Sequence, residues 1–345
     1  MKGISAKLLT LPSTQKGKFM IKSLLSAAFT ASLMLGATSA VAQTSWDLPL
    51  AWPADNYIAE NEQIFADEVK EATNGDVVIT LHPGGSLGFK GPEMFSAVRD
   101  GLVPIGDMLL NQQVGENKLL GLESLPYLIG SFDELREFQK PYRPLLDEVF
   151  GAANQKVLFT IPWPQQQIFT KKEINTIEDM SGIKIRSYDK SSTEIFKAAG
   201  MTPVQLPWGE VIPSLAAGAI DAVATSSPSA IDGAFWEFLG YAYPTRQTWN
   251  TNVVSVNLDA WNALTKEQQD QISAIAEELE PKFWAAAQDV DANAMETLAD
   301  NGMVIGTLSE ETRDALRERA APLREAALNE MGDKAKAVVE EFQNQ

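Results

Sequence analysis

Hydrophobic residues recur along the first part of this chain with two different spacings. Residues 46–52 alternate between apolar and polar as a strand does, whereas Ile58, Phe65 and Val69 recur at helical spacing. Further along, the same two patterns predict a strand at 77–82, a helix at 91–102 and a strand at 103–110. This β-α-β-α-β order predicts a parallel sheet.

The rest of the chain continues to alternate short apolar runs with helical patterns. Ser131 and Glu134 have the spacing of a capping box at the start of a helix. Ser191 or Ser192 can cap a second helix, which Gly200 can end. Further helices are expected from about 209, 229 and 309. Strands are expected at 155–162, 183–186, 203–206, 220–225, 250–257 and 303–308.

The longest helical pattern runs from Thr265 to Asp300 and is interrupted only by Pro281. Thr265 and Gln268 have the spacing of a capping box. Such a helix would be on the order of 50 Å long at 1.5 Å per residue, so it exceeds one small lobe. A coiled coil is the alternative, but alanine and glutamine occupy too many of its core positions.

The first 42 residues have the pattern of a secretory signal peptide. Five lysines without an acid precede the apolar run at 24–37, which leads to Ala40-Val41-Ala42. A membrane-spanning helix would need about 20 apolar residues. We therefore expect export to the periplasm, with cleavage after Ala42.

The remaining length predicts two lobes, because about 300 residues exceed what one hydrophobic core usually supports. The sequence contains no internal repeat and no low-complexity linker, so the chain is expected to cross between the lobes more than once. We expect lobe 1 at 43–163 plus about 250–289. Lobe 2 is expected at 164–249 plus about 290–345.

Composition excludes several classes of function. The net charge is −18, and −23 without the five lysines near the N-terminus, so nucleic acid and anionic lipid are poor partners. The absence of cysteine excludes disulfides, thiolate nucleophiles and cysteine-bound zinc. His82 is the single histidine, placed before a Pro-Gly-Gly turn where a structural role is expected, and no catalytic or nucleotide-binding motif occurs. An enzyme, a metal and a cofactor are therefore not expected.

Arg186 is the strongest candidate for a binding residue. It ends the apolar strand at 183–186, where an open α/β sheet binds its ligands, and its guanidinium can donate two parallel hydrogen bonds to one carboxylate. A charge in such a strand is costly unless it is paired. The partner is either a ligand or a structural acid such as Asp189 or Glu210.

The sequence around Arg186 resembles the periplasmic solute-binding proteins of TRAP transporters, the DctP family. The resemblance extends from about Trp46 to the C-terminus. Its pattern of a strand, a helix and a second helix is carried here by Gly182, Lys184, Arg186, Pro203, Glu210, Val211, Gly218 and Asp221.

This resemblance implies a fold and a function. The expected fold is α/β, a two-lobe periplasmic binding protein (Venus flytrap) with a long helix bracing both lobes. The protein would be a monomer that captures a small organic carboxylate, clamped by Arg186, and delivers it to the membrane subunits of a TRAP transporter. An ABC-type receptor, a sensor for a membrane kinase and an exported hydrolase are the alternatives.

The resemblance also suggests further substrate-binding residues. Trp208 precedes a helix where family members place an aromatic ring against the ligand. Gln166 stands where sialic-acid-binding members carry a second arginine, and Thr225 stands where many relatives have asparagine, so a sugar acid is not favoured. The other expected residues are Trp163 and Trp52, with Asn111, Trp249 and Asn250 ranked below them.

The combination of one carboxylate clamp with several tryptophans predicts the ligand class. An aromatic or hydroxy/keto monocarboxylate would stack on the rings and present one anionic end to Arg186. A zwitterion such as a betaine or an ectoine-like solute would use the same rings through cation-π contacts.

Overall fold

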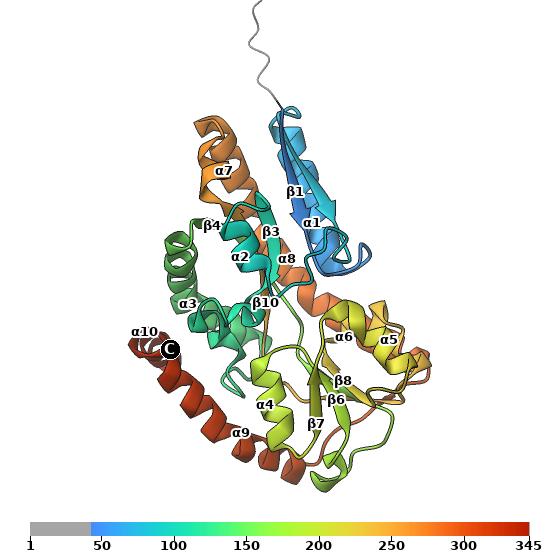
Figure 1. The fold of residues 1–345 in the computed structure, drawn as a ribbon. Helices are drawn as coiled ribbons and strands as arrows, with labels where there is room; N and C mark the ends of the chain where they lie inside the picture. The colour runs from blue at the N-terminus through green and yellow to red at the C-terminus, as the bar shows by residue number, and fades with distance from the viewer. Residues whose placement is uncertain (1–42, 345) are drawn as a thin grey trace, which may run out of the picture. The chain divides into compact units, whose positions relative to one another are not determined.

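Three sheets carry the strands of residues 43–344, the part of the chain that the computed structural model describes (Figure 1). The predicted signal peptide and its cleavage site lie outside these residues. The first sheet pairs β1 (Thr44–Pro49) with β2 (Val77–His82). The second has the order β3 (Ile105–Leu109), β10 (Thr251–Asn257), β4 (Gln155–Pro162). The third has the order β11 (Val304–Ile305), β9 (Tyr241–Pro244), β5 (Gln167–Thr170), β8 (Ala222–Thr225), β6 (Lys184–Ser187), β7 (Thr202–Gln205).

Helices connect and cover these sheets. They are α1 (Tyr57–Ala72), α2 (Met94–Arg99), α3 (Phe132–Ala152), α4 (Lys190–Ala198), α5 (Val211–Ala216), α6 (Ser227–Asp232), α7 (Leu258–Asn262), α8 (Lys266–Asp300), α9 (Glu310–Met331) and α10 (Asp333–Gln343). Below, the first lobe means the two- and three-stranded sheets with α1 to α3. The second lobe means the six-stranded sheet with α4 to α6.

The first lobe does not contain the single parallel sheet that the sequence predicted. β1 and β2 pair in parallel, but β3 pairs antiparallel with β10, which also pairs antiparallel with β4. The partner of β3 therefore comes from a distant segment, after the chain has passed through the second lobe. Alternation of local patterns cannot reveal such a pairing.

The second lobe places Arg186 in the middle of its sheet. β6 lies between β7 and β8 and runs parallel to both, whereas β5 pairs antiparallel with β8 and β9. The sequence did not predict β5 and β9. The helix expected from about 229 is present as α6 but ends at Asp232 instead of continuing to 239, because the chain turns at Ala234, which has a left-handed φ of 45°. The expected strand at 303–308 shortens to β11.

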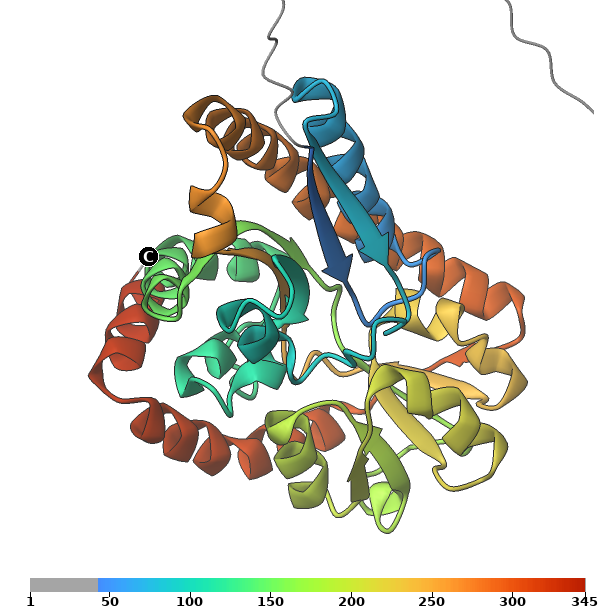
Figure 2. The same cartoon turned by 45° about the horizontal axis from the view of Figure 1, so that its top comes forward.

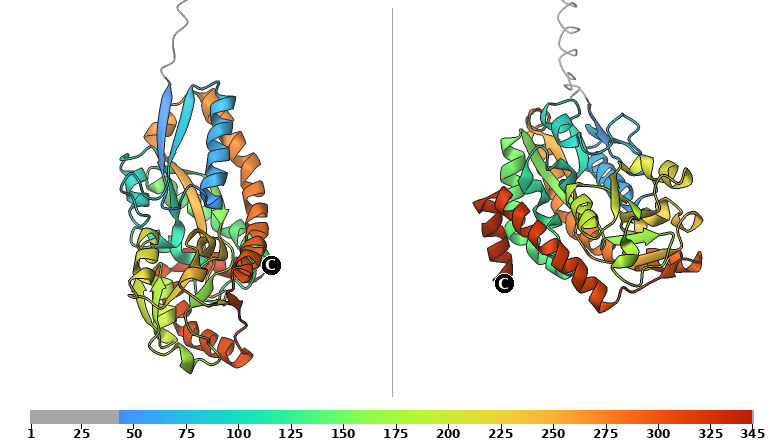
Figure 3. Two further views of the ribbon diagram at one scale, coloured as in Figure 1. Left: turned by 90° about the vertical axis from the view of Figure 1, so that its right-hand side faces the viewer. Right: turned by 60° about the horizontal axis from the view of Figure 1, so that its bottom comes forward.

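The longest helix braces both lobes, as predicted. α8 begins at the predicted capping box, in which Thr265 and Gln268 bond reciprocally. It packs against α1 and β4 of the first lobe and against α6 of the second, and Figure 3 shows α1 and α8 side by side. Besides α8, two connections cross between the sheets of the two lobes, from β4 to β5 and from β9 to β10.

The C-terminal helices return to the first lobe. α9 packs against α4, and α10 then packs against α3, so the red C-terminal segment curves toward the green helix in Figure 2. Phe342 of α10 lies edge-on to Phe138 at 5.3 Å between ring centroids. α10 therefore contacts the first lobe, and the expected lobe boundaries stay a prediction.

Candidate functional site

A pocket between the two lobes contains most of the predicted site residues. The space between its walls, counted together with the open solvent at its mouth, is about 320 Å³. The six residues ranked highest from the sequence all line it, and so does Asn250. The lining residues are Trp52, Leu109, Gln112, Trp163, Gln166, Arg186, Tyr188, Trp208, Thr225, Ser226, Ser229 and Asn250.

The Arg186 guanidinium is buried and held by backbone oxygens. Its side chain is on β6 and the residue is only 3% exposed. Nε donates to the Leu206 carbonyl oxygen at 3.0 Å, and Nη1 donates to the Ala224 carbonyl oxygen at 3.1 Å. The guanidinium carbon lies 5.6 Å from the centroid of the Tyr188 ring. These contacts use two of the five N–H groups and fix the orientation of the fork.

Neither acid suggested as a structural partner pairs with Arg186. Glu210 lies instead 3.3 Å from Lys90, and Asp189 caps α4. Among residues 43–344, no carboxylate oxygen lies within 4.0 Å of a guanidinium nitrogen of Arg186. Burial lowers the pKa of Arg186 to about 10, so it stays protonated at neutral pH. The pocket thus contains a buried positive charge that a ligand anion can neutralise.

Asp189 follows the lining residue Tyr188 but does not itself line the pocket. The expected cap of α4, Ser191 or Ser192, is wrong: Asp189 accepts from the Ser192 backbone N–H at 2.7 Å, and the Ser192 side chain bonds back. Asn111 donates to its other oxygen at 2.7 Å. Burial raises the pKa of Asp189, and these donors together with Arg186 oppose the shift.

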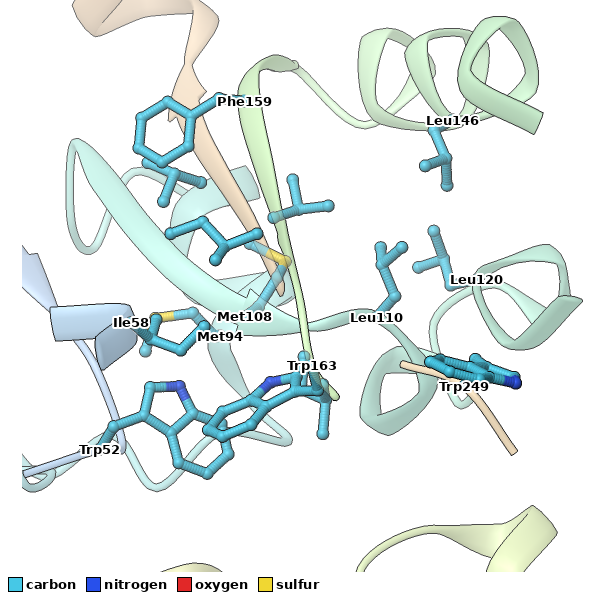
Figure 4. Close-up of a cluster of buried hydrophobic side chains, with 14 of the residues drawn as sticks. Trp52, Ile58, Met94, Met108, Leu110, Leu120, Leu146, Phe159, Trp163 and Trp249 are labelled. Atoms are coloured by element: carbon cyan, nitrogen blue, oxygen red, sulfur yellow. The ribbon is translucent and has the colours of Figure 1, made fainter. Parts of the chain in front are cut away.

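Trp52 and Trp163 form an aromatic pair at the pocket (Figure 4). Their ring centroids are 4.7 Å apart and their planes meet at 66°. Trp52 Nε1 donates to Asp107 Oδ2 at 2.9 Å, and Trp163 Nε1 donates to Asn252 Oδ1 at 2.6 Å. Because both polar edges are occupied inside the first lobe, the rings offer the ligand apolar surface.

Trp208 contributes a third ring from the second lobe. It is only partly buried, and its centroid lies 6.3 Å from that of Phe235, with an angle of 30° between the planes. The pocket therefore has aromatic surface from both lobes.

Several polar groups in the pocket make long hydrogen bonds. The Ser226 and Ser229 hydroxyl oxygens are 3.3 Å apart, and Gln166 Nε2 reaches the Pro164 carbonyl oxygen at 3.4 Å. Asn250 Nδ2 donates to the Tyr188 hydroxyl at 3.3 Å. Bonds near the limit of the hydrogen-bond range are weak, so these groups can exchange them for bonds to a ligand at little cost in free energy.

Two residues ranked lower from the sequence do not line the pocket. Asn111 lies behind it and donates to Asp189 and, at 2.6 Å, to Asn250 Oδ1. Trp249 is a core residue whose Nε1 donates to the Ile129 carbonyl oxygen at 2.9 Å. Figure 4 shows Trp249 beside Leu120, apart from the other two labelled tryptophans.

The sequence reasoning missed several lining residues. Tyr188 follows Arg186 by two positions, and this period-two spacing could have placed it on the same side of the strand. Gln112 donates to the Tyr188 carbonyl oxygen at 3.2 Å and so joins the lobes. Ser226 and Ser229 had no signal, because serines near a strand end are common in ordinary turns.

His82 lies outside the pocket. Its Nε2 is 2.8 Å from Asp47 Oδ1, on the neighbouring strand β1. Residues 43–344 contain no group of three or more His, Asp or Glu side chains placed to hold a metal ion. Within the same residues, no helix is long and apolar enough to cross a membrane.

Comparison with known proteins identifies the family. The sequence profile of the bacterial extracellular solute-binding proteins, family 7, called DctP, matches residues 50–330. The chain belongs to the DctP family. Membership of DctP, the family of TRAP periplasmic solute receptors, confirms the resemblance seen in the sequence.

Solved structures of DctP proteins share the fold over almost their entire length. A pyroglutamate-specific TRAP solute-binding protein from an unidentified marine microbe is 31% identical, covers 88% of this chain and 100% of its own, and has a TM-score of 0.84. DctP6 of Bordetella pertussis, a receptor binding pyroglutamic acid, is 29% identical, with coverages of 88% and 100% and a TM-score of 0.85. These similarities confirm the predicted two-lobe fold.

A curated relative binds a different kind of solute. The ectoine-binding periplasmic protein TeaA of Halomonas elongata is 23% identical over 92% of this chain and 95% of its own length. Relatives within DctP thus differ in the solutes for which they are named.

Proposed function

We propose that this TRAP solute-binding protein captures a small organic monocarboxylate in the periplasm and passes it to the membrane permease. The observation that carries the proposal is the buried Arg186 guanidinium without a carboxylate partner among residues 43–344. Nη2 and the second N–H of Nη1 remain to bind both oxygens of one carboxylate. The acidic surface gives no long-range attraction to an anion, so affinity depends on these local donors.

The rest of the pocket favours a flat ring with polar atoms at its far side. Trp52, Trp163 and Trp208 offer apolar surface, whereas Ser226 and Ser229 offer hydroxyls with weak hydrogen bonds. Pyroglutamate combines one carboxylate with a small lactam ring, and two of the similar structures bind it. Pyroglutamate is therefore the first ligand to test. Benzoate-type and hydroxy/keto acids follow, as the sequence suggested.

An ectoine-like zwitterion is the second candidate. It also carries a carboxylate, and its cationic ring could lie against the indole faces. The similarity to TeaA supports this alternative.

Ligand binding would act through closure of the two lobes. Several contacts join the lobes around the pocket. Asn56 Nδ2 donates to Asp232 Oδ2 at 2.6 Å and Asn111 Nδ2 donates to Asp189 Oδ2 at 2.7 Å, while Lys90 pairs with Glu210 and Gln112 donates to the Tyr188 carbonyl oxygen. A ligand held by Arg186 on one side and the tryptophan pair on the other adds contacts that only the closed arrangement can make.

Calorimetric titration of the purified protein with pyroglutamate, benzoate, pyruvate and ectoine tests the proposal. We expect saturable binding of one of the carboxylates, lost in Arg186→Ala and kept in Arg317→Ala, where an exposed arginine is removed. If the protein binds none of the acids, or if Arg186→Ala binds as tightly as the native protein, the carboxylate proposal is wrong.

A further inference from the structure

A pair of buried carboxyl groups lies behind the tryptophan pair of the pocket. Glu62 on α1 is 0% exposed and Asp107 on β3 is 2% exposed. The two side chains are in hydrogen-bonding contact with each other. The binding of a carboxylate at Arg186 does not by itself require either of them.

The two acids differ in their hydrogen-bond donors. Asp107 accepts from Trp52 Nε1 at 2.9 Å and from Asn252 Nδ2 at 2.7 and 2.8 Å. When both groups are treated as carboxylates, neither oxygen of Glu62 has a donor within residues 43–344. No lysine or arginine of these residues forms an ion pair with either acid.

One proton bound by this pair of acids would avoid two adjacent buried negative charges. Two adjacent buried carboxyl groups cannot both be ionised without a large loss of solvation and strong repulsion. The negative charge belongs on Asp107, where three donor contacts stabilise it, and the proton belongs on Glu62, which then donates to Asp107. In this state both oxygens of Asp107 keep their donors, and the protonated oxygen of Glu62 gains a partner.

Resting on the proposed function, we propose that protonated Glu62 is a positioning residue that holds Asp107, and through it Trp52 and Trp163, in place for ligand binding. Asp107 bonds Trp52 directly and reaches Trp163 through Asn252, whose Oδ1 accepts from the second indole at 2.6 Å. The chain of bonds thus runs from Glu62 to the polar edges of both pocket rings.

The pKa values agree with this assignment. Burial, with the neighbouring Asp107 second, raises the pKa of Glu62 well above its ordinary value of 4.5. Burial also raises the pKa of Asp107, but its donors Asn252, Glu62 and Trp52 limit the rise to about 6. Burial raises the pKa of the nearby Tyr57 of α1, and the carboxylates of Asp232, Asp291 and Asp107 add to this shift, so Tyr57 stays neutral.

Two substitutions of Glu62 test whether its hydrogen bond to Asp107 is what matters. One keeps a hydrogen-bond donor and the other removes it. Glu62→Gln keeps a donor that cannot titrate, so pyroglutamate affinity should stay within about twofold. Glu62→Ala leaves the Asp107 charge without this donor, and affinity should fall about tenfold as the indoles lose their fixed orientation. Glu60→Ala, at an exposed position of the same helix, is the matched control and should bind as the native protein does.

Two ligand-free readouts complete the experiment. At pH 9, where Glu123 and Asp232 with pKa values of about 7 are ionised, infrared spectra of the native protein and of Glu60→Ala should contain a carbonyl band of a protonated carboxylic acid that Glu62→Gln lacks. Near-ultraviolet circular dichroism should report altered tryptophan surroundings in Glu62→Ala only. These readouts remain informative in the native protein and Glu62→Gln even if Glu62→Ala does not fold.

The outcomes separate this inference from the proposed function. A native spectrum without the protonated-acid band overturns the inference, as does a folded Glu62→Ala variant with native affinity and native tryptophan signals. If the native protein binds none of the acids while the band and the tryptophan changes occur as expected, the carboxylate proposal fails and the positioning of the indoles by Glu62 is supported.

Discussion

At the residue scale, the geometry of Arg186 predicts that a positive charge alone is not sufficient for tight binding of a carboxylate. Arg186→Lys keeps the positive charge but replaces the fork with a single ammonium, which cannot satisfy Leu206, Ala224 and both carboxylate oxygens. We expect carboxylate affinity to fall about tenfold or more, by calorimetry, because a charge-assisted hydrogen bond is worth roughly 1.5–3 kcal/mol. Arg317→Lys is the control. Unchanged affinity in Arg186→Lys would remove the bidentate clamp from the mechanism.

A second residue prediction concerns the polar side of the pocket. Thr225→Val keeps the shape of a buried side chain and removes its hydroxyl. If the far end of the ligand is polar, pyroglutamate affinity should fall by roughly threefold to tenfold, the effect of one hydrogen bond, while benzoate affinity stays the same or rises. Parallel titrations with the two acids measure this difference. Equal losses for both would show that Thr225 acts on the pocket as a whole.

The same residues show what sequence reasoning could and could not find. Arg186 was identifiable because a lone charge at the end of an apolar strand needs a partner. The absence of a structural partner was not predictable, since Asp189 is only three positions away and turns to cap α4 instead. Glu62 gave no signal either: on an amphipathic helix it looks like any solvated acid, and only tertiary packing buries it beside Asp107.

At the scale of elements, α8 offers a direct test of local stabilisation. Thr265→Ala removes the hydroxyl that accepts from the Gln268 backbone N–H, and the loss of such a cap destabilises by about 1 kcal/mol. Urea unfolding should show this loss. Thr297→Ala, near the other end of α8, is the control; its hydroxyl bonds back to the Asn293 carbonyl oxygen and its loss should be close to neutral. Equal effects of the two substitutions would contradict a specific role of the cap.

Elements with strong local signals were predicted well, and those that depend on distant partners were not. α8 combines a capping box with long helical periodicity, and β4 was found at its observed bounds. β5 and β9 are four-residue strands with glutamine, tyrosine and proline. They are defined only by their pairing with each other and with β8 and β11 on either side. The break after α6 likewise follows from backbone geometry that no spacing rule encodes.

At the scale of the whole molecule, buried acids predict a particular dependence of stability on pH. Burial raises the pKa of Glu123 from 4.5 to about 7, although Thr251 and Gln139 donate to it. Burial likewise raises the pKa of Asp232, at the lobe contact, from 3.8 to about 7. Both groups bind protons more tightly in the folded state. The free energy of unfolding should therefore be greatest near and below the unfolded pKa values and fall as pH rises through 7.

Thermal unfolding between pH 5 and pH 8 measures this dependence. We expect the midpoint to fall by roughly 5 °C across this range, since a destabilisation of about 1 kcal/mol shifts a large protein by a few degrees. The net charge of −18 adds repulsion in the same direction, so added salt should recover part of the loss. Glu123→Gln removes one titration and should flatten the curve, whereas Glu318→Gln, at an exposed position of α9, should not. If the unfolding midpoint instead rises toward pH 8 in low salt, Glu123 and Asp232 are ionised in the folded protein and stabilised by their hydrogen-bond donors. The prediction would then be wrong.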